Sequence, residues 1–405
     1  MRLTIGAAWL AGLGFSAWSA LALAQPEIFG TSAALVDGGS FSIQGRDFGQ
    51  KNPAAPWVYQ DFEDGTVGEE IIGQDEGGFW HQGPPREPIY SQGKQRLPSE
   101  ICMLQDYADD NNKQFGLIAD CDTIYMSGWC YRDDWASTAM LSDNQKLWGN
   151  FIACDDDGTP IVTPGARYDT YFAYNTGHME INDANGSNLY NNWSVGCNPM
   201  LNQWFRMERY MAMGTVNGNN GVTWVAANLR KLGEITGTFF TSGDPYCSWY
   251  VGHYFRNTSG ATLRVYWSEV YVDSTLARVE VGDNAVWANC THREIQIPSA
   301  WRDDAITVTA NQGTFPSGQA LYVFVVNRYG QPSGGSAVTF ATSSGDEGVP
   351  GQPGQPAHHE QAQQNFFHNA TVETGQHALP EGDLPIHARQ LARQARQEIA
   401  PLQGQ

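Results

Sequence analysis

Residues 263–272 read LRVYWSEVYV, and this run decides how the rest of the chain is interpreted. Apolar and polar side chains alternate along most of it, which is typical of a β-strand with one face against a core. Similar runs occur at residues 168–174, 203–210 and 221–227, with clusters of Asn, Asp and Gly between them. Many short strands separated by turn signals predict an all-β sandwich or jelly roll.

Two further stretches of β pattern flank this zone. Residues 38–49, GGSFSIQGRDFG, read as a strand followed by a tight turn, and residues 274–342 contain apolar runs at 306–310 and 320–326. Residues 59–273 lie between them and hold most of the tryptophans and six of the seven cysteines. A chain of this length suggests two or three domains.

The amino terminus has the features of a secretory leader. Arg2 is the only charge within residues 1–24, an apolar run follows, and Ala22-Leu23-Ala24 gives a small-x-small cleavage site. An uncleaved anchor is the alternative, because the apolar run approaches the length of a membrane helix. We expect a signal peptide over residues 1–24 and a periplasmic or secreted mature chain without a transmembrane segment.

The composition narrows the class of partner. The chain carries 43 acidic and 23 basic residues, for a formal net charge of −20, so no surface for neutralising phosphates is expected and nucleic acid is disfavoured. The same charge disfavours acidic polysaccharide as a bulk electrostatic partner, although one local basic cleft could override it. Forty-four glycines and 12% aromatic residues indicate strands and turns.

The cysteines predict disulfides if the chain is exported. An oxidising compartment favours their pairing, and an odd number leaves at least one thiol unpaired or shared between chains. Cys121 and Cys130 are close enough in sequence to close a hairpin, but the connectivity stays open. No Cys-x-x-Cys pair is present, which argues against zinc. The seven positions are Cys102, Cys121, Cys130, Cys154, Cys197, Cys247 and Cys290.

The last part of the chain, residues 343–405, differs in composition from the rest. It contains eleven glutamines, five of the nine histidines and a Gly-Pro-Gln stretch, which predict a disordered linker. A short basic helix is expected at 384–399, where Arg389, Arg393 and Arg396 share one face.

The middle zone resembles the concanavalin A-like lectin/glucanase superfamily. The resemblance is carried by residues 61–65 (DFEDG), the run Trp204-x-Arg206-x-Glu208-x-Tyr210 and the closing residues 266–273, and it covers about half of the chain. It implies a jelly roll over residues 59–273 and a carbohydrate ligand.

The flanks resemble an immunoglobulin-like TIG/IPT domain. Residues 38–49 are similar to its first hairpin, and residues 321–333 are similar to its last. We therefore expect residues 25–58 and 274–342 to form one smaller sandwich. The jelly roll is either inserted into this sandwich or followed by it. Insertion requires strand pairing between residues 38–49 and the zone 274–342.

Candidate catalytic residues follow from the enzymes of this superfamily. Laminarinase-like members carry Glu-x-Asp-x-x-Glu, since a retaining mechanism needs two carboxyl groups about 5 Å apart. Here Glu180 has asparagines at both partner positions, so a glycoside hydrolase is disfavoured. Jelly-roll alginate lyases carry Arg-x-Glu-x-Arg, of which Arg206 and Glu208 keep the first two positions. The proton acceptors and donors that could join them are His178, His253 and Tyr254.

Sugar binding requires fewer precisely placed groups than catalysis does. Aromatic side chains on turn-rich segments are the candidates for sugar binding. The predicted ligand-binding residues are Trp129, Tyr131, Arg132, Trp135, Glu180, Tyr190 and Trp193. A structural calcium ion is a further expectation, because carboxylates at the opening and closing strands of a jelly roll can meet. Its predicted ligands are Asp61, Glu63, Glu269 and Asp273.

The sequence as a whole favours an exported carbohydrate-binding protein that acts on extracellular or cell-wall polysaccharide. A jelly-roll polysaccharide lyase is the first alternative, and a structural or adhesive surface protein is the second. Whether the chain is an enzyme, which glycan it binds and its oligomeric state stay open at this stage.

Overall fold

The computed structural model describes twelve segments of the chain. They are residues 24–32, 34–71, 88–107, 115–133, 144–152, 169–173, 178–182, 188–192, 202–215, 217–238, 246–256 and 263–341. The predicted linker and basic helix after residue 341, and nearly all of the predicted leader, lie outside these residues.

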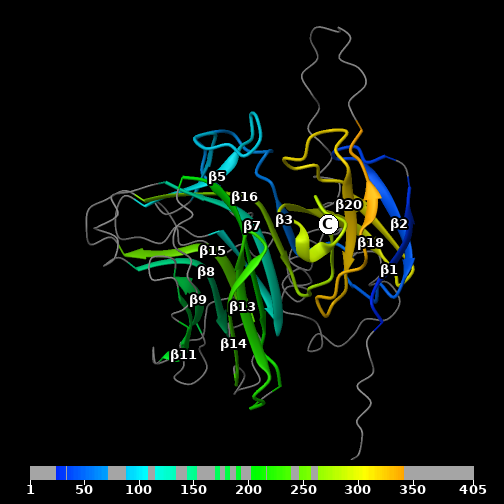
Figure 1. The fold of residues 1–405 in the computed structure, drawn as a ribbon. Coiled ribbons are helices and arrows are strands. Elements are labelled where there is room, and N and C mark those ends of the chain that lie inside the picture. The colour runs from blue at the N-terminus through cyan, green and yellow to red at the C-terminus, as the bar shows by residue number, and fades with distance from the viewer. Residues whose placement is uncertain are drawn as a thin grey trace, which may run out of the picture.

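Almost every described element is a strand, and the strands form three antiparallel sheets (Figure 1). The all-β class predicted from the sequence is therefore confirmed. A 3-10 helix at Trp287–Asn289 is the single helix among the described residues. No helix in the described part of the chain has the length and apolar character of a membrane span.

The two larger sheets form the unit that we call the large domain. In spatial order, the eight-stranded sheet contains β14 (Arg230–Gly237), β13 (Gly221–Ala227), β12 (Trp204–Ala212), β7 (Thr123–Arg132), β16 (Leu263–Asp273), β5 (Cys102–Tyr107) and β4 (Ile89–Ser91), with β3 (Val58–Gln60) also paired to β16. The six-stranded sheet contains β11 (Asn188–Asn192), β10 (His178–Asn182), β9 (Asp169–Ala173), β8 (Asn144–Ile152), β15 (Tyr246–Arg256) and β6 (Phe115–Cys121).

The two sheets stack face to face. The indole nitrogen of Trp267 on β16 donates to the side chain of Gln105 (2.9 Å), whose amide donates across the gap to the carbonyl of Val251 on β15 (2.8 Å). Alternate residues of each strand point to opposite faces, so each strand of the eight-stranded sheet has an inner row against the other sheet and an outer row. Phe205, Met207 and Met211 of β12 lie on the inner side and are fully buried.

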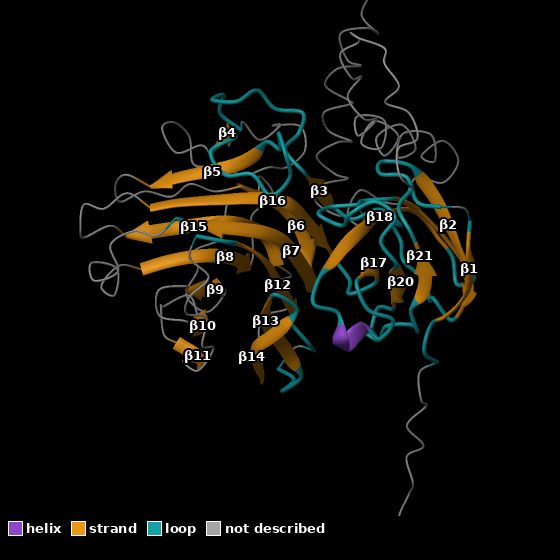
Figure 2. Cartoon of the chain, turned by 45° about the horizontal axis from the view of Figure 1, so that its top comes forward, coloured by secondary structure: helices purple, strands orange, loops and turns teal. Residues whose placement is uncertain are grey.

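The third sheet forms the small domain and joins two distant parts of the chain (Figures 1 and 2). Its order is β1 (Glu27–Thr31), β2 (Ser40–Arg46), β19 (Ala305–Thr309), β18 (Arg293–Trp301), β17 (Arg278–Gly282), β20 (Leu321–Val326) and β21 (Ser336–Val338). Residues 40–44 of β2 pair with residues 305–309 of β19, which is the pairing that an inserted jelly roll requires. The sheet curls so that side chains from both halves share one core, including Phe41, Ile43, Val279, Val308 and Val325.

A buried ion pair connects the two segments of the chain that pass between the domains. Lys51, which follows β2, lies 2.9 Å from the carboxylate of Asp273 at the end of β16, and both side chains are at most 3% exposed. The ammonium also donates to the carbonyl of Ala55 (3.2 Å), and the Tyr271 hydroxyl donates to Asp273 (2.7 Å). The polypeptide therefore leaves and re-enters the small domain at one fixed point.

The cysteines correct one expectation. Cys102, Cys130 and Cys290 are free and buried, and burial raises the pKa of the Cys102 thiol to about 12. The suggested pairing of Cys121 with Cys130 is wrong, because the thiol of Cys130 is free and buried.

Candidate functional site

The outer face of the eight-stranded sheet carries the side chains of interest. Along β12, Trp204, Arg206, Glu208 and Tyr210 all point outward, because they occupy alternate positions. Each pairs with an outward residue of β7, from Tyr131 opposite Trp204 to Tyr125 opposite Tyr210. The small domain covers the middle of this face, and at its two ends the described side chains of Trp204, Tyr131, Tyr210 and Trp224 are partly exposed.

The middle of the face is a buried interface between the domains, and Arg206 lies at its centre. Its guanidinium donates to the carboxylate of Glu280 on β17 (2.6 Å), the hydroxyl of Ser127 (3.0 Å) and the carbonyl of Arg293 (2.9 Å). Glu208 accepts from the hydroxyl of Tyr125 at 2.6 Å. Arg206 is only 2% exposed and its donors are occupied by protein atoms, so the expectation that Arg206 and Glu208 meet a substrate is contradicted.

Glu294 of β18 organises a second part of the interface. Its carboxylate accepts from Arg96 (2.6 Å) and the Trp129 indole (3.1 Å), and His292 lies 2.8 Å away. Burial by itself would raise the pKa of Glu294, but Arg96 and His292 outweigh burial and hold that pKa at about 2. Trp129 is stacked on His292 and covered by Arg96, so it is an interface residue and not the sugar platform that its sequence position suggested.

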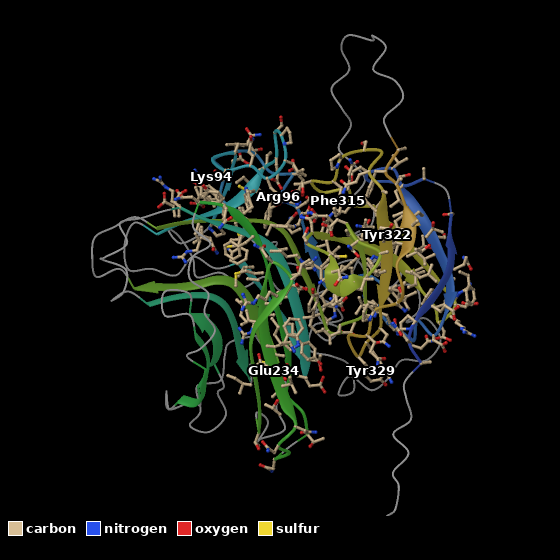
Figure 3. The ribbon with its side chains drawn as sticks, viewed as in Figure 1. Lys94, Arg96, Glu234, Phe315, Tyr322 and Tyr329 are labelled. Carbon is tan, nitrogen blue, oxygen red and sulfur yellow. The ribbon has the colours of Figure 1, made fainter. Side chains whose placement is uncertain are left out.

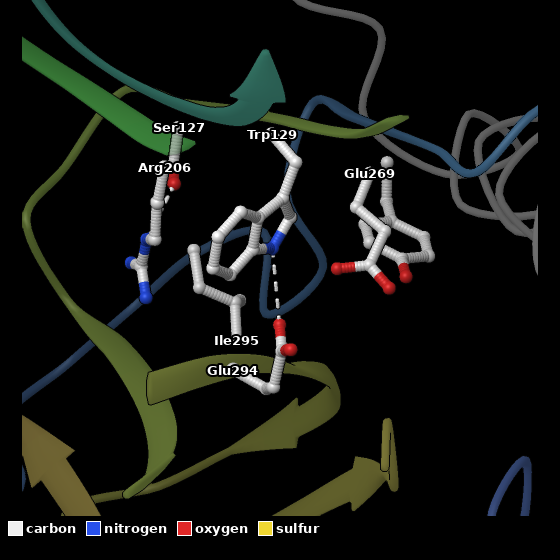
Figure 4. A pocket seen from close by; sticks show the side chains of 7 residues that line it. Ser127, Trp129, Arg206, Glu269, Glu294 and Ile295 are labelled. Atoms are coloured by element: carbon white, nitrogen blue, oxygen red, sulfur yellow. Dashed lines mark hydrogen bonds between the residues drawn. The ribbon is translucent and has the colours of Figure 1, made fainter. Parts of the chain in front are cut away.

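A small cavity lies between these two parts (Figure 4). Its volume is about 10 Å³, close to the space that one buried water requires. Its lining consists of Tyr59, Ser127, Trp129, Arg206, Glu269, Glu294 and Ile295. A cavity of this size is too small for a sugar, so the interface has a structural role.

Glu269 makes the stability of the protein depend on pH. It sits in the left-handed region (φ +49°) at a bulge of β16. Burial, with Glu294 and Glu100 nearby, outweighs Arg96 and raises its pKa to about 8. A folded pKa above the unfolded value stabilises the protein at low pH, and this contribution is lost as the pH rises through about 8. We expect the melting temperature to fall as the pH rises from about 4.5 to about 8, and Glu269→Gln to flatten that fall.

Glu63 provides the control for this prediction. Burial raises its pKa only to about 7, so Glu63→Gln should flatten the fall only up to about pH 7 and leave the part between about pH 7 and pH 8 in place. A Glu269→Gln variant whose melting temperature falls as steeply as that of the unmodified protein would contradict the assignment.

One end of the outer face holds a row of aromatic side chains, which we call the aromatic row: Trp204 on β12, Tyr131 on β7 and Tyr266 on β16. Tyr131 contacts Trp204 edge-on at 5.7 Å between ring centroids, and Tyr266 at 6.0 Å. Trp204 and Tyr131 are partly exposed, while Tyr266 is buried at the base of the row. Apolar side chains of β4 and β5 support the row from the side, namely Ile89, Cys102 and Leu104.

Charged groups border the aromatic row. The ammonium of Lys94 lies 5.0 Å from the centroid of the Tyr131 ring and 3.5 Å from a carboxylate oxygen of Asp133. A hydrogen bond to Tyr131 and the charge of Asp133 raise the pKa of Lys94. Beyond Tyr266, Arg264 and Asp106 form a partly exposed pair at 3.0 Å. The site therefore offers aromatic faces together with cationic donors and carboxylate acceptors.

The remaining sequence candidates do not gather at this site. Arg132 points to the inner side of β7 and is 2% exposed, so its predicted contact with ligand is wrong. The other positions belong to the six-stranded sheet, where only backbone is described: His178 and Glu180 on β10, Tyr190 on β11, and His253 and Tyr254 on β15.

The predicted lyase centre is not assembled by this arrangement. The strands of His178 and His253 are three strand spacings apart, roughly 14 Å. Arg206 belongs to the other sheet and faces the small domain. Trp135 and Trp193 lie outside the described residues, so their predicted contacts with ligand stay predictions.

The predicted calcium ligands are held by other partners. Glu269 pairs with Arg96 and Asp273 with Lys51, while Glu63 accepts from the backbone of Ile101 (3.1 Å). Asp61 accepts from the backbone of Glu63 at 3.2 Å. Within the described residues, no group of three or more His, Cys, Asp or Glu side chains is arranged to hold a metal ion.

Comparisons with known proteins give the fold context. No family model matches the chain, and no curated protein matches it. Among solved structures, the alginate lyase Aly36B (a mutant in complex with alginate trisaccharide) is 11% identical over 54% of this chain and 97% of its own, with a TM-score of 0.39. The endo-β-1,4-glucuronan lyase of the fungus Trichoderma reesei is 13% identical over 55% and 97%, with a TM-score of 0.37.

A third similar structure is the marine PL-14 alginate lyase of Aplysia kurodai, 11% identical over 48% of this chain and 90% of its own, with a TM-score of 0.35. All three of these structures are named as lyases of alginate or glucuronan. At such identities and TM-scores the likeness transfers no residue role and no activity to this chain.

Proposed function

We propose that the protein is an exported carbohydrate-binding protein and that Trp204 and Tyr131 of its aromatic row contact polysaccharide. The observation that carries the proposal is the line of Trp204, Tyr131 and Tyr266 across three neighbouring strands, with Lys94 over its middle. Aromatic rings present apolar faces that pack on the C–H faces of sugars, and adjacent polar tips bond hydroxyl groups. A line of rings across a sheet suits an extended chain of sugars better than a single small molecule.

The charges around the aromatic row are balanced, which supports a ligand recognised by contact and not by long-range attraction. Lys94 is matched by Asp133, and Arg264 by Asp106. Each exposed pair contributes little to stability, so its groups can exchange partners with a ligand at small cost.

Substitution of the aromatic row tests the proposal. We expect Trp204→Ala and Lys94→Ala each to weaken polysaccharide binding at least about tenfold, or ~1.4 kcal/mol. The chain offers matched controls at the other end of the same face, where Lys231 lies 5.5 Å from the Trp224 ring. Trp224→Ala and Lys231→Ala should leave the affinity unchanged. Retention on a panel of immobilised neutral and uronate polysaccharides gives the measurement, and equal losses in both pairs would contradict the proposal.

A polysaccharide lyase is the second candidate, and the contact between Lys94 and Tyr131 favours it. An ammonium group can neutralise the carboxylate of a uronate, and a neighbouring phenol can exchange a proton with the sugar ring. The same panel distinguishes the two functions, because lyase cleavage creates unsaturated uronate ends with new ultraviolet absorbance. Retention without new absorbance would exclude the lyase, and loss of that absorbance in Tyr131→Phe would support it.

We also propose that the chain is exported and that the small domain is of the TIG/IPT type. Export is supported by the leader-like residues 1–24, and the TIG/IPT type by the gathering of β1 and β2 with β17–β21. Mass spectrometry of the mature protein should find Gln25 at its amino terminus. Retention on none of the polysaccharides would favour the structural or adhesive alternative.

A further inference from the structure

We infer that the small domain positions the proposed binding surface, by holding the loop of residues 92–101 through a contact between Arg96 and Glu294. The loop connects β4 to β5 and carries Lys94 over Tyr131. The part of this inference that concerns ligand rests on the proposed function, whereas the part that concerns the loop rests on geometry alone.

The loop is folded around the carboxylate of Glu100. This group accepts from the backbone nitrogens of Arg96 and Leu97 (2.9 Å for Leu97), and from the hydroxyl of Ser268 on β16. The side chain of Gln92 donates to the carbonyl of Ser99 at 2.9 Å and closes the base. The loop thus has a defined shape, but these contacts lie within the large domain and leave its outer part without support from the small domain.

Arg96 supplies that support. Its side chain leaves the loop, crosses to the small domain and is 3% exposed. The guanidinium lies 4.7 Å above the Trp129 ring, contacts Glu269 and donates to Glu294 at 2.6 Å. In Figure 3, Arg96 lies between Lys94, above the large domain, and Phe315 of the small domain.

Glu294 is itself fixed, so it can serve as an anchor. Its carboxylate also accepts from Trp129, and His292 lies within hydrogen-bonding distance. Gly313 packs so closely that a Cβ there would lie 2.1 Å from a Glu294 carboxylate oxygen, at a backbone φ of +52°. Glu294 is therefore closely packed, and its contacts with Trp129 and His292 hold the carboxylate to which Arg96 donates.

Lys94 is only two residues from Arg96. Its own carbonyl accepts from the thiol of Cys102 at 3.2 Å, so the backbone is held on both sides of the Lys94 side chain. Loss of the Arg96–Glu294 contact should free the loop and displace Lys94 from Tyr131, without altering Trp204 or Tyr131 themselves.

Hydrogen exchange of the intact protein tests the positioning role directly. Glu294→Gln keeps the shape of the side chain and removes its charge. We expect the amides of residues 94–97 to exchange at least about tenfold faster, while those of β20 stay protected and show that the protein is folded. The matched control is Glu234→Gln, which removes an exposed pair with Lys231 and should change neither region. Arg96→Lys, which loses the paired donors of the guanidinium, should reproduce the Glu294→Gln result. Unchanged exchange at residues 94–97 in both interface variants would overturn the inference.

Affinity for the polysaccharide retained best by the unmodified protein tests the link to binding. Glu294→Gln should weaken binding as Lys94→Ala does, and should have no further effect in a Lys94→Ala background, because it acts through Lys94. If the two substitutions weaken binding additively, the inference that Glu294 acts on binding through Lys94 is overturned. Faster exchange in a protein that retains no polysaccharide at all would refute the proposed function and leave the positioning role standing.

Discussion

Glu280→Gln is expected to lower the free energy of unfolding by ~3–5 kcal/mol, because it leaves buried cations without their counter-charge. Glu280 is fully buried and its carboxylate lies 2.6 Å from Arg206, 3.2 Å from Arg278 and 3.0 Å from Arg293. Burial by itself would raise the pKa of Glu280, but the three arginines outweigh burial and drive that pKa far below its usual range. This carboxylate therefore joins Arg206 of the large domain to two arginines of the small domain.

Urea unfolding of the two variants Glu280→Gln and Glu234→Gln measures the effect. The pair of Glu234 with Lys231 is about half exposed, and such pairs contribute ~0–1 kcal/mol. A Glu280→Gln variant whose loss of stability matches that of Glu234→Gln would show that the interface cluster does not hold the domains together.

Trp267→Ala should cost a similar ~3–5 kcal/mol, since it removes a large side chain from a packed core. Trp267 is 0% exposed and lies on the inner side of β16. Its indole bonds the side chain of Gln105, which in turn bonds β15, so the substitution also weakens the contact between the two stacked sheets.

Trp204→Ala is the matched control for this second prediction. It removes the same side chain from a partly exposed position on the same sheet, so its effect on the unfolding free energy should be clearly smaller. Equal losses for the two variants would contradict the placement of Trp267 in the core, and would also disqualify Trp204→Ala as a probe of binding.

The sequence predicted the strands well because alternation is a local property. The runs at residues 203–210, 221–227 and 263–272 fall in β12, β13 and β16, and the glycine-bounded run at 38–49 contains β2. The alternation also placed Arg206 and Glu208 on one face of a strand. It could not show which face another domain would cover, because the covering residues, such as Glu280 and Glu294, lie 70 or more positions later in the chain.

The candidate site, like the domain interface, could be predicted only in part from local sequence patterns. Tyr131 was selected from a local cluster with Trp129 and Arg132, yet alternation and the small domain direct these three side chains to three different environments. Trp204 and Tyr266 were visible as strand residues, and their outward positions opposite Tyr131 follow only from the strand register. Lys94 lies in a loop, where no periodic pattern marks a side chain, so the sequence offered no signal for it.

Hydroxyl-radical footprinting, read by mass spectrometry with and without the polysaccharide that the protein retains best, shows whether the aromatic row is the surface that binds polysaccharide. Saturating polysaccharide should lower the oxidation of Trp204 and Tyr131, while Trp224 at the opposite end of the same face is oxidised as before. Unchanged oxidation of Trp204 and Tyr131 under saturation, or protection confined to Trp224, would contradict the proposal.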